Sequence, residues 1–207
     1  MLDSSDTWLI NDEDKAPGFM LANAGYDIWL GNSRGNKHSR KHKTLNPDKN
    51  ASFWDFTFQH MADYDIPAVL KYVGDYTQQK VHYIGHSQGT IQMHVALSKR
   101  NPVVEEYLDE YFGFGPVAYV SYINSNVMNL IDKSALLQWY KFRHIHEFMP
   151  SFGWFTTDVG VLFCADFPKV CADLLAQIMD ADPSVDNYDR YDVLVGHDPS
   201  GTSVMNM

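Results

Sequence analysis

One pentapeptide limits the folds open to this chain more than any other feature. An apolar run from Val81 to Ile84 leads directly into the sequence Gly85-His86-Ser87-Gln88-Gly89, and a helix-compatible stretch begins at Thr90. A Gly-x-Ser-x-Gly sequence between a strand and a helix is typical of a nucleophile elbow, a tight turn with strained backbone dihedral angles at its serine. Its two glycines leave room where the strand and the helix approach each other. The pattern therefore predicts that the Ser87 hydroxyl is held at the end of a sheet.

The same turn predicts a site for a negative oxygen. The backbone N–H of Gln88 would face the oxygen of a tetrahedral intermediate at Ser87, and the N-terminus of the following helix adds positive potential there. The alternative is an ordinary glycine-rich turn, because the pentapeptide also arises by chance. The flanking strand and helix favour the elbow. We expect His86, beside the serine, to pack rather than react, and His82 to be structural as well.

The rest of the N-terminal half alternates between predicted helices and strands. Pro67 lies inside one predicted helix and marks a kink or a restart, because proline lacks an amide hydrogen. The alternation favours a parallel sheet with helices on both faces, although two or three of the expected strands are missing. In chain order the elements are a helix over Pro17–Ala24, a strand over Tyr26–Leu30, an aromatic helix that begins in Phe53–Phe58, a helix over Met61–Tyr76, the strand Val81–Ile84, a helix over Gln88–Lys99 and a strand over Tyr111–Val117.

From about Ala118 onward the sequence changes character. Leu136–Phe148 and Phe152–Phe163 are rich in large apolar and aromatic residues, and Val170–Met179 has apolar residues at helical spacing. We therefore divide the chain into a partial sheet-and-helix core over residues 1–118, which includes the pentapeptide, and a mostly helical cap over residues 119–207. Most of the aromatic side chains are expected to hold the cap helices together. An aromatic cap would also suit lipid substrates.

Charge and hydropathy exclude several classes of partner. The 207 residues carry 16 Lys and Arg against 26 Asp and Glu, a net charge of −10, which argues against nucleic acid as a ligand. No run approaches the roughly 20 apolar residues of a membrane span. No Cys and His cluster has zinc-ligand spacing and no glycine loop suits a phosphate, so we expect no metal and no cofactor. The oligomeric state is not predicted.

One loop is nevertheless basic. It could meet anionic lipid headgroups. The favoured interpretation is a solvated loop, because no apolar or aromatic residues are interleaved with the charges. The loop contains Arg34, Lys37, Arg40, Lys41 and Lys43, with His38 and His42 among them.

Two further features bear on the compartment. Cys164 and Cys171, seven residues apart, would form either a local disulfide in an oxidising compartment or two free buried thiols. Asn50-Ala51-Ser52 is a glycosylation sequon in a polar loop, a pattern that suits a secreted or lysosomal chain and also occurs by chance. Neither feature settles the compartment.

Several blocks resemble one known family. The segments 24–36, 64–68, 82–90 and 197–207 look, in this order, like the acid lipases, the group that contains gastric lipase and lysosomal acid lipase. The resemblance implies an α/β-hydrolase fold with a lid-bearing cap. It implies serine-dependent hydrolysis, through an acyl-enzyme and without a cofactor, of carboxylic esters of neutral lipids, either triacylglycerols or cholesteryl esters, at acidic pH. It also implies work at a lipid–water interface in the lysosome or outside the cell.

The resemblance assigns part of a catalytic site. Ser87 would be the nucleophile, and Gln88 matches the residue whose backbone N–H serves the oxyanion hole. The family's other oxyanion donor follows a His-Gly pair that is absent here, and Met1 falls where that donor would be. The family's catalytic Asp and His lie after the segment with which this chain ends, so no residue is assigned to them. Arg34 is expected to fix a turn through a salt bridge rather than hold a ligand carboxylate.

The missing base leaves three hypotheses. We favour an internal fragment of an acid lipase, poorly soluble and inactive alone. The second is a non-catalytic short form that binds lipid or a partner. The third is another hydrolase or esterase of the same fold that uses an internal base, for which only some combinations, such as Asp158 or Asp166 followed by His197, satisfy the required order. The residues weighed for such a pair are Asp158, Asp166, Asp192, His144, His146 and His197.

Overall fold

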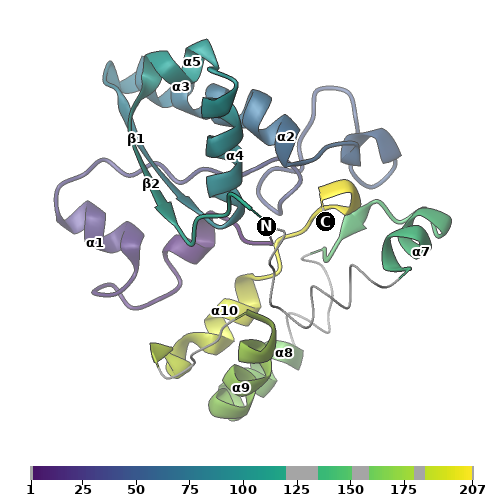
Figure 1. The fold of residues 1–207 in the computed structure, drawn as a ribbon. Coiled ribbons are helices and arrows are strands. Elements are labelled where there is room, and N and C mark those ends of the chain that lie inside the picture. The colour runs from purple at the N-terminus through teal and green to yellow at the C-terminus, as the bar shows by residue number, and fades with distance from the viewer. Residues whose placement is uncertain (1, 120–134, 151–158, 180–184, 207) are drawn as a thin grey trace.

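The computed structural model describes residues 2–119, 135–150, 159–179 and 185–206. Figure 1 shows two groups of elements: α3, α4 and α5 lie on one side of the β1–β2 sheet, and α8, α9 and α10 gather at the other end of the molecule. The C-terminal segment returns to the first residues of the chain, where the Ser200 amide donates a hydrogen bond to the Leu2 carbonyl. The fold therefore brings the two described ends of the chain together.

A parallel pair of strands forms the described sheet. β1 (Val81–His86) pairs with β2 (Leu108–Phe114), with Gly85 opposite Gly113. The two helices α4 (Gln88–Ser98) and α5 (Pro102–Tyr107) connect them, so the prediction of a partial parallel sheet with flanking helices is confirmed. β2 ends three residues before the predicted end, because the chain turns away at Gly115, where φ is +53°.

The long helix before the sheet restarts at its proline. The predicted helix is confirmed, but it consists of α2 (Phe58–His60), one wide π turn over Met61–Asp65 and α3 (Ile66–Thr77). The Ile66 amide bonds back to the Met61 carbonyl across the π turn, and Pro67, which has no amide hydrogen, follows within the first turn of α3.

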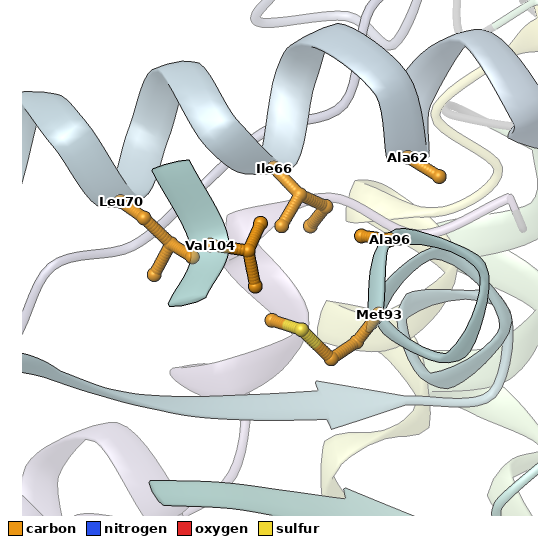
Figure 2. Packing of buried hydrophobic residues seen from close by; sticks show 6 residues of the cluster. All are labelled: Ala62, Ile66, Leu70, Met93, Ala96 and Val104. Atoms are coloured by element: carbon orange, nitrogen blue, oxygen red, sulfur yellow. The ribbon is translucent and has the colours of Figure 1, made fainter. Parts of the chain in front are cut away.

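An apolar core joins this helix to the sheet layer. Figure 2 shows its side chains pointing toward one another from the π turn and α3, from α4 and from α5. The exposed fraction of each is 6% or less. Burial of this surface is the main source of the stability of this half of the molecule. The cluster consists of Ala62, Ile66, Leu70, Met93, Ala96 and Val104.

Two predicted elements of the N-terminal half are wrong. The helix α1 (Pro17–Asn23) forms as predicted, but Tyr26–Leu30 after it is extended without strand pairing in the described sheet. Its Trp29 ring lies instead against Tyr72 and Tyr76 of α3, with centroids 5.9 and 5.2 Å away. A strand needs a neighbouring backbone to satisfy its polar groups, and side-chain pattern alone does not supply one.

The second wrong element is the aromatic helix expected to begin in Phe53–Phe58. The structure has only a 3-10 turn over Ala51–Trp54, and α2 begins at Phe58. Thr57 between them has extended dihedral angles and caps α2 by accepting a hydrogen bond from the Gln59 amide. The aromatic rings pack on one another and on one methionine in a small cluster, rather than along one helix face. That cluster consists of Phe53, Trp54, Phe56 and Met61.

The C-terminal part is mostly helical, as expected. Cys164 and Cys171 form a disulfide that packs with Ala172 and Tyr191 in a small core. Among the described residues no helix is long and apolar enough to cross a membrane. Part of the predicted apolar stretch Phe152–Phe163 lies outside the described residues. The elements are α7 (Leu136–Phe142), β3 (Glu147–Phe148), α8 (Gly160–Asp166), α9 (Pro168–Met179), α10 (Tyr191–His197), β4 (Thr202–Ser203), antiparallel to β3, and 3-10 turns over Ser5–Trp8, Tyr188–Arg190 and Val204–Asn206.

Candidate active site

The turn between β1 and α4 has the backbone that its sequence predicts. Ser87 lies between the last residue of β1 and the first of α4, with φ 50° and ψ −111°. Few residues other than glycine adopt such angles, which cost about 1–3 kcal/mol and persist only where the surrounding structure enforces them. The strain therefore marks Ser87 as a residue held in place by its neighbours.

Hydrogen bonds hold this turn from both sides. The Ser87 amide donates to the Phe114 carbonyl at the end of β2, at 3.0 Å. The Ser87 carbonyl accepts from the Thr90 amide at 2.9 Å and from the Thr90 hydroxyl at 2.6 Å. That hydroxyl oxygen, fully buried, accepts in turn from the Val117 amide at 2.8 Å. The backbone of Ser87 is thus anchored to the sheet and to α4 while its side chain stays half-exposed.

The two glycines of the pentapeptide are needed for space. A Cβ atom on Gly85 would lie 2.9 Å from the carbonyl carbon of Gly89, and one on Gly89 would lie 3.3 Å from the Tyr83 hydroxyl. Neither glycine has a positive φ, so close approach of strand and helix is the reason for them. The Tyr83 hydroxyl donates to the Gly89 carbonyl at 3.2 Å, and burial raises the Tyr83 pKa far above its ordinary value, which keeps this donor protonated.

The amide of Gln88 is available to a ligand oxygen. Gln88 is the first residue of α4, and the Ser87 side chain makes no capping hydrogen bond to the helix. The first amides of a helix lack partners within the helix and carry partial positive charge. An anionic oxygen on a carbon atom bonded to Ser87 Oγ would therefore meet a favourable potential.

The histidine beside the serine does not pack in the core. The His86 side chain is 52% exposed, and its Nδ1 lies 3.8 Å from a carboxylate oxygen of Asp3. This contact is the main cause of the lowered pKa of Asp3. Our expectation of a packing role for His86 is therefore wrong, and the reason is that β1 carries its last side chain out toward the N-terminal segment. His82 is also exposed, 3.8 Å from Asp109 and 3.6 Å from Glu110.

The histidine weighed as an internal base has another partner. His197 Nδ1 lies 2.8 Å from Oδ2 of Asp6, not beside Asp166, and Asp158 lies outside the described residues. Asp192 accepts a hydrogen bond from the next amide in α10, at 2.7 Å. Within the described part of the chain, no hydrogen bond joins any of the weighed Asp or His side chains to Ser87. The described geometry therefore joins none of the weighed pairs that lie within it to Ser87.

The basic loop is mostly paired with carboxylates. Arg34 forms the expected salt bridge, to Asp65, with its Nε and Nη2 atoms 2.9 and 2.5 Å from Oδ1 and its own amide 3.1 Å from Oδ2. Lys37 binds Asp6 at 2.6 Å. Arg40 binds Glu147 and, at 2.7 Å, Asp48. The interpretation of a solvated loop is therefore wrong for Lys37 and Arg40, because Asp6 and Glu147, distant in sequence, meet them in the fold.

Two smaller features complete the description. The Asn50 side chain is exposed, and its Oδ1 accepts a hydrogen bond from the Asn46 amide at 2.7 Å. Among the described residues, no group of His, Cys, Asp and Glu side chains is arranged to hold a metal ion. No local sequence pattern indicated the roles of the Asp3, Asp6 and Glu147 carboxylates, because their partners lie far away along the chain.

Comparisons with known proteins agree with this geometry. Residues 9–107 match the family described as the alpha/beta hydrolase fold. The whole chain is 37% identical to gastric triacylglycerol lipase of Bos taurus and covers 52% of that protein. It is 36% identical to lipase member K and to lipase member J of Homo sapiens, again along its whole length, and covers 52% and 56% of them.

The chain spans about half the length of the curated relatives it matches. The part of this chain that aligns with each relative includes β1, the strained turn at Ser87 and α4. With its parallel sheet and flanking helices, the chain has an α/β-hydrolase fold, and it is similar along its whole length to gastric triacylglycerol lipase and to lipase members K and J.

Proposed function

We propose that this chain carries the nucleophile of a lipase that hydrolyses carboxylic esters of neutral lipids. Ser87 is the nucleophile, and the Gln88 amide is one donor of the oxyanion hole. The observation that carries the proposal is the positive φ of Ser87 at the junction of β1 and α4, which holds its hydroxyl at the end of the sheet. The similarity to gastric triacylglycerol lipase supports triacylglycerol as the substrate class, and the resemblance to the acid lipases adds cholesteryl esters as the alternative.

The proposed reaction has two steps. In the first, Ser87 Oγ attacks the ester carbonyl carbon and gives its proton to a base, and the carbonyl oxygen becomes an anion that faces the Gln88 amide. The bond from the carbonyl carbon to the alcohol oxygen then breaks, and the alcohol leaves with that proton. In the second, water attacks the acyl group on Ser87, which releases the fatty acid and returns the hydrogen to Oγ.

The base and its orienting carboxylate are not assigned to residues of this chain. In the acid lipases that the chain resembles, the catalytic Asp and His follow the segment that matches residues 197–207. We therefore propose that the complete enzyme uses residues from that further part, and that the 207-residue chain alone is nearly inactive. Loss of the base and acid of a triad usually lowers kcat by several powers of ten.

The remaining proposals concern the setting of the site. Residues 1–118 form the partial core and residues 119–207 a cap, which would act at a lipid–water interface. The disulfide between Cys164 and Cys171 and the exposed sequon at Asn50 support a secreted or lysosomal location. Peptide mapping of the natural protein for a glycan on Asn50 tests that part directly.

Hydrolysis of an emulsified triacylglycerol and of a cholesteryl ester tests the proposed activity. The protein should be isolated at its native length, and fatty-acid release should be followed between pH 4 and 7. We expect release that disappears in Ser87→Ala while the unfolding transition is kept. Unchanged turnover in Ser87→Ala would contradict the proposal. Binding to the emulsion without any turnover would favour the non-catalytic short form.

A further inference from the structure

One carboxylate connects three segments of the chain near the candidate site. Asp6, whose side chain is only 21% exposed, accepts Lys37 Nζ at 2.6 Å on Oδ2 and His38 Nε2 at 2.8 Å on Oδ1. Its Oδ2 also lies 2.8 Å from Nδ1 of His197. An ionised carboxylate can only accept, so both histidine nitrogens must donate to it. Three donors from two distant parts of the chain therefore converge on Asp6.

Backbone hydrogen bonds close the same junction. The Ser200 amide donates to the Leu2 carbonyl at 2.6 Å, and the Lys37 amide donates to the Ser200 carbonyl at 2.8 Å. Lys37 Nζ also donates to the His197 carbonyl at 2.8 Å. The segment 197–200 is thus held between the first residues and the basic loop. Figure 1 shows the C-terminal segment returning beside the N-terminus.

The junction lies next to the serine turn. Asp3, three residues before Asp6, faces His86, which directly precedes Ser87. Leu2, the partner of Ser200, is the neighbour of Asp3. A displacement of the first residues would therefore move groups that border the turn, without touching the core that supports β1 and α4.

The charge of Asp6 survives acid conditions. Burial raises its pKa, but the hydrogen bonds from Lys37, His197 and His38 outweigh burial and bring the pKa far below its ordinary value. By contrast, Ser5 is bound to the basic loop through Asn32, with two hydrogen bonds of 3.0 Å, and that pair does not reach the C-terminal segment. Asp6 is the side chain that ties all three segments together by ionic contacts.

We propose that Asp6 is a positioning residue, a three-way clasp that holds segment 197–200 on the first residues of the chain and thereby fixes Leu2 and Asp3 beside Ser87. The clasp itself follows from the contacts of Asp6, whereas its effect on the site rests on the proposed function of Ser87. Neutralising Asp6 should release both partner segments and leave the β1–β2 sheet intact.

Hydrogen exchange at two amides tests the clasp. The Ser200 and Lys37 amides are donors of the closing backbone bonds, and the Thr90 amide at the serine turn is an internal control. We expect Asp6→Asn to speed exchange at Ser200 and Lys37 by about tenfold or more at fixed pH and to leave Thr90 unchanged. Asp63→Asn, which removes an ion pair with Lys99 far from the clasp, should change none of the three.

Lys37→Gln provides a second variant from the other side of the clasp. It should speed exchange at the Ser200 and Lys37 amides. When Asp6→Asn and Lys37→Gln are combined, exchange should be only slightly faster than in the faster single variant, because both substitutions remove the same connection. Asp6→Glu, which keeps the charge, should restore part of the protection. Protected Ser200 and Lys37 amides in Asp6→Asn, or fully multiplicative effects of the two variants, would overturn the clasp. If Asp6→Asn does not fold, Lys37→Gln decides.

Labelling of Ser87 separates the clasp from the proposed function. With diethyl p-nitrophenyl phosphate as the probe and the native-length protein, Asp6→Asn should lower the maximal labelling rate about tenfold or more with little change in the half-saturating concentration. An unchanged rate would overturn the link between the clasp and the site. No labelling in the unaltered protein would contradict the proposed function, while exchange would still decide the clasp.

Discussion

The serine turn and the returning C-terminal segment are held in place by different forces. The turn at Ser87 is fixed by close contact of two glycine positions, by bonds to Phe114 and Thr90, and by an apolar core behind it. Among the described residues, none of the apolar clusters includes segment 197–200. It is held by a carboxylate, a lysine and backbone bonds to residues that lie more than 150 positions away.

This difference indicates that close packing and charged contacts have separate structural roles. In a close-packed core even a volume change of one methylene group has an energetic cost, so such packing suits a residue whose geometry must not vary. Half-buried ionic contacts are weaker and depend on pH and salt. The molecule thus uses packing to hold the candidate nucleophile and polar contacts to place the segment next to it. Substitutions in the core and at the polar contacts separate these two contributions.

Removal of a core side chain should have the largest effect. Leu70→Ala deletes a side chain that is 1% exposed between α3 and the sheet layer, and we expect a loss of about 2–5 kcal/mol in the free energy of unfolding. Leu97→Ala, on the exposed side of α4, should cost clearly less because Leu97 is 37% exposed. Urea unfolding of both variants measures the difference. Equal costs would show that the cluster does not support this half.

A methyl group at the elbow should cost nearly as much. Gly85→Ala places a carbon within 3.0 Å of Gly89 backbone atoms, which cannot rotate away, so we expect a loss of about 1–3 kcal/mol. Gly31→Ala is the matched control, because nothing lies within 4 Å of a Cβ there. Chemical denaturation gives both values. A harmless Gly85→Ala would refute the close approach of strand and helix.

The strain at Ser87 predicts that replacing this residue with glycine raises stability and abolishes activity. Ser87→Gly relieves the unfavourable dihedral angles, and after the entropy cost of a glycine we expect a gain of about 1 kcal/mol in the free energy of unfolding together with loss of ester hydrolysis. Ser87→Ala should lose activity without this gain, since it keeps a Cβ. Thermal unfolding of the two variants side by side provides the comparison, and a Ser87→Gly protein no more stable than Ser87→Ala would argue against stored strain.

The smallest effect concerns pH at the polar junction. Burial, and to a smaller extent the nearby Asp3 carboxylate, raises the pKa of Asp198 to about 6. Hydrogen bonds from Ser200 and Thr7 and the charge of Lys37 lower this pKa but do not outweigh the rise. Between about pH 4 and 6 the folded state therefore holds a proton that the unfolded state has lost, so this group makes stability fall as pH rises.

Asp198→Asn should remove that fall. We expect the stability of the variant to change less than that of the unaltered chain between pH 4 and 6, as measured by urea midpoints at several pH values. The contribution of Asp6 to the pH dependence of stability has the opposite sign. Because its pKa is lowered in the folded state, its carboxylate supplies stability that is lost as the pH falls below the ordinary carboxyl range. Identical pH curves for Asp198→Asn and the unaltered chain would exclude Asp198 as the source.

Local features of the fold were predictable because they depend on neighbours in sequence. The pentapeptide determines the turn, since Gly85 and Gly89 meet only if a strand runs directly into a helix. Pro67 marks the restart of α3 because a missing amide acts where it stands. The alternation of predicted strands and helices indicated a parallel sheet, which the structure confirms.

Features that depend on distant partners were not predictable. Tyr26–Leu30 has the side-chain pattern of a strand, but pairing needs a second backbone, and in the described structure Trp29 packs on α3 instead. Asp6 and His197 are 191 positions apart, and neither residue carries a local sign of the other. The salt bridge of Arg34 was expected, yet its partner Asp65 was not, for the same reason.

The most direct test of the central claim is mass spectrometry of the native-length protein after reaction with diethyl p-nitrophenyl phosphate. The probe reacts with an activated serine, which displaces p-nitrophenolate and retains a diethylphosphoryl group. We predict one such group per molecule, on Ser87, with loss of ester hydrolysis in proportion and no label in Ser87→Ala. An esterase-active protein that carries the label on another residue, or stays active with Ser87 fully labelled, would contradict the claim that Ser87 is the nucleophile.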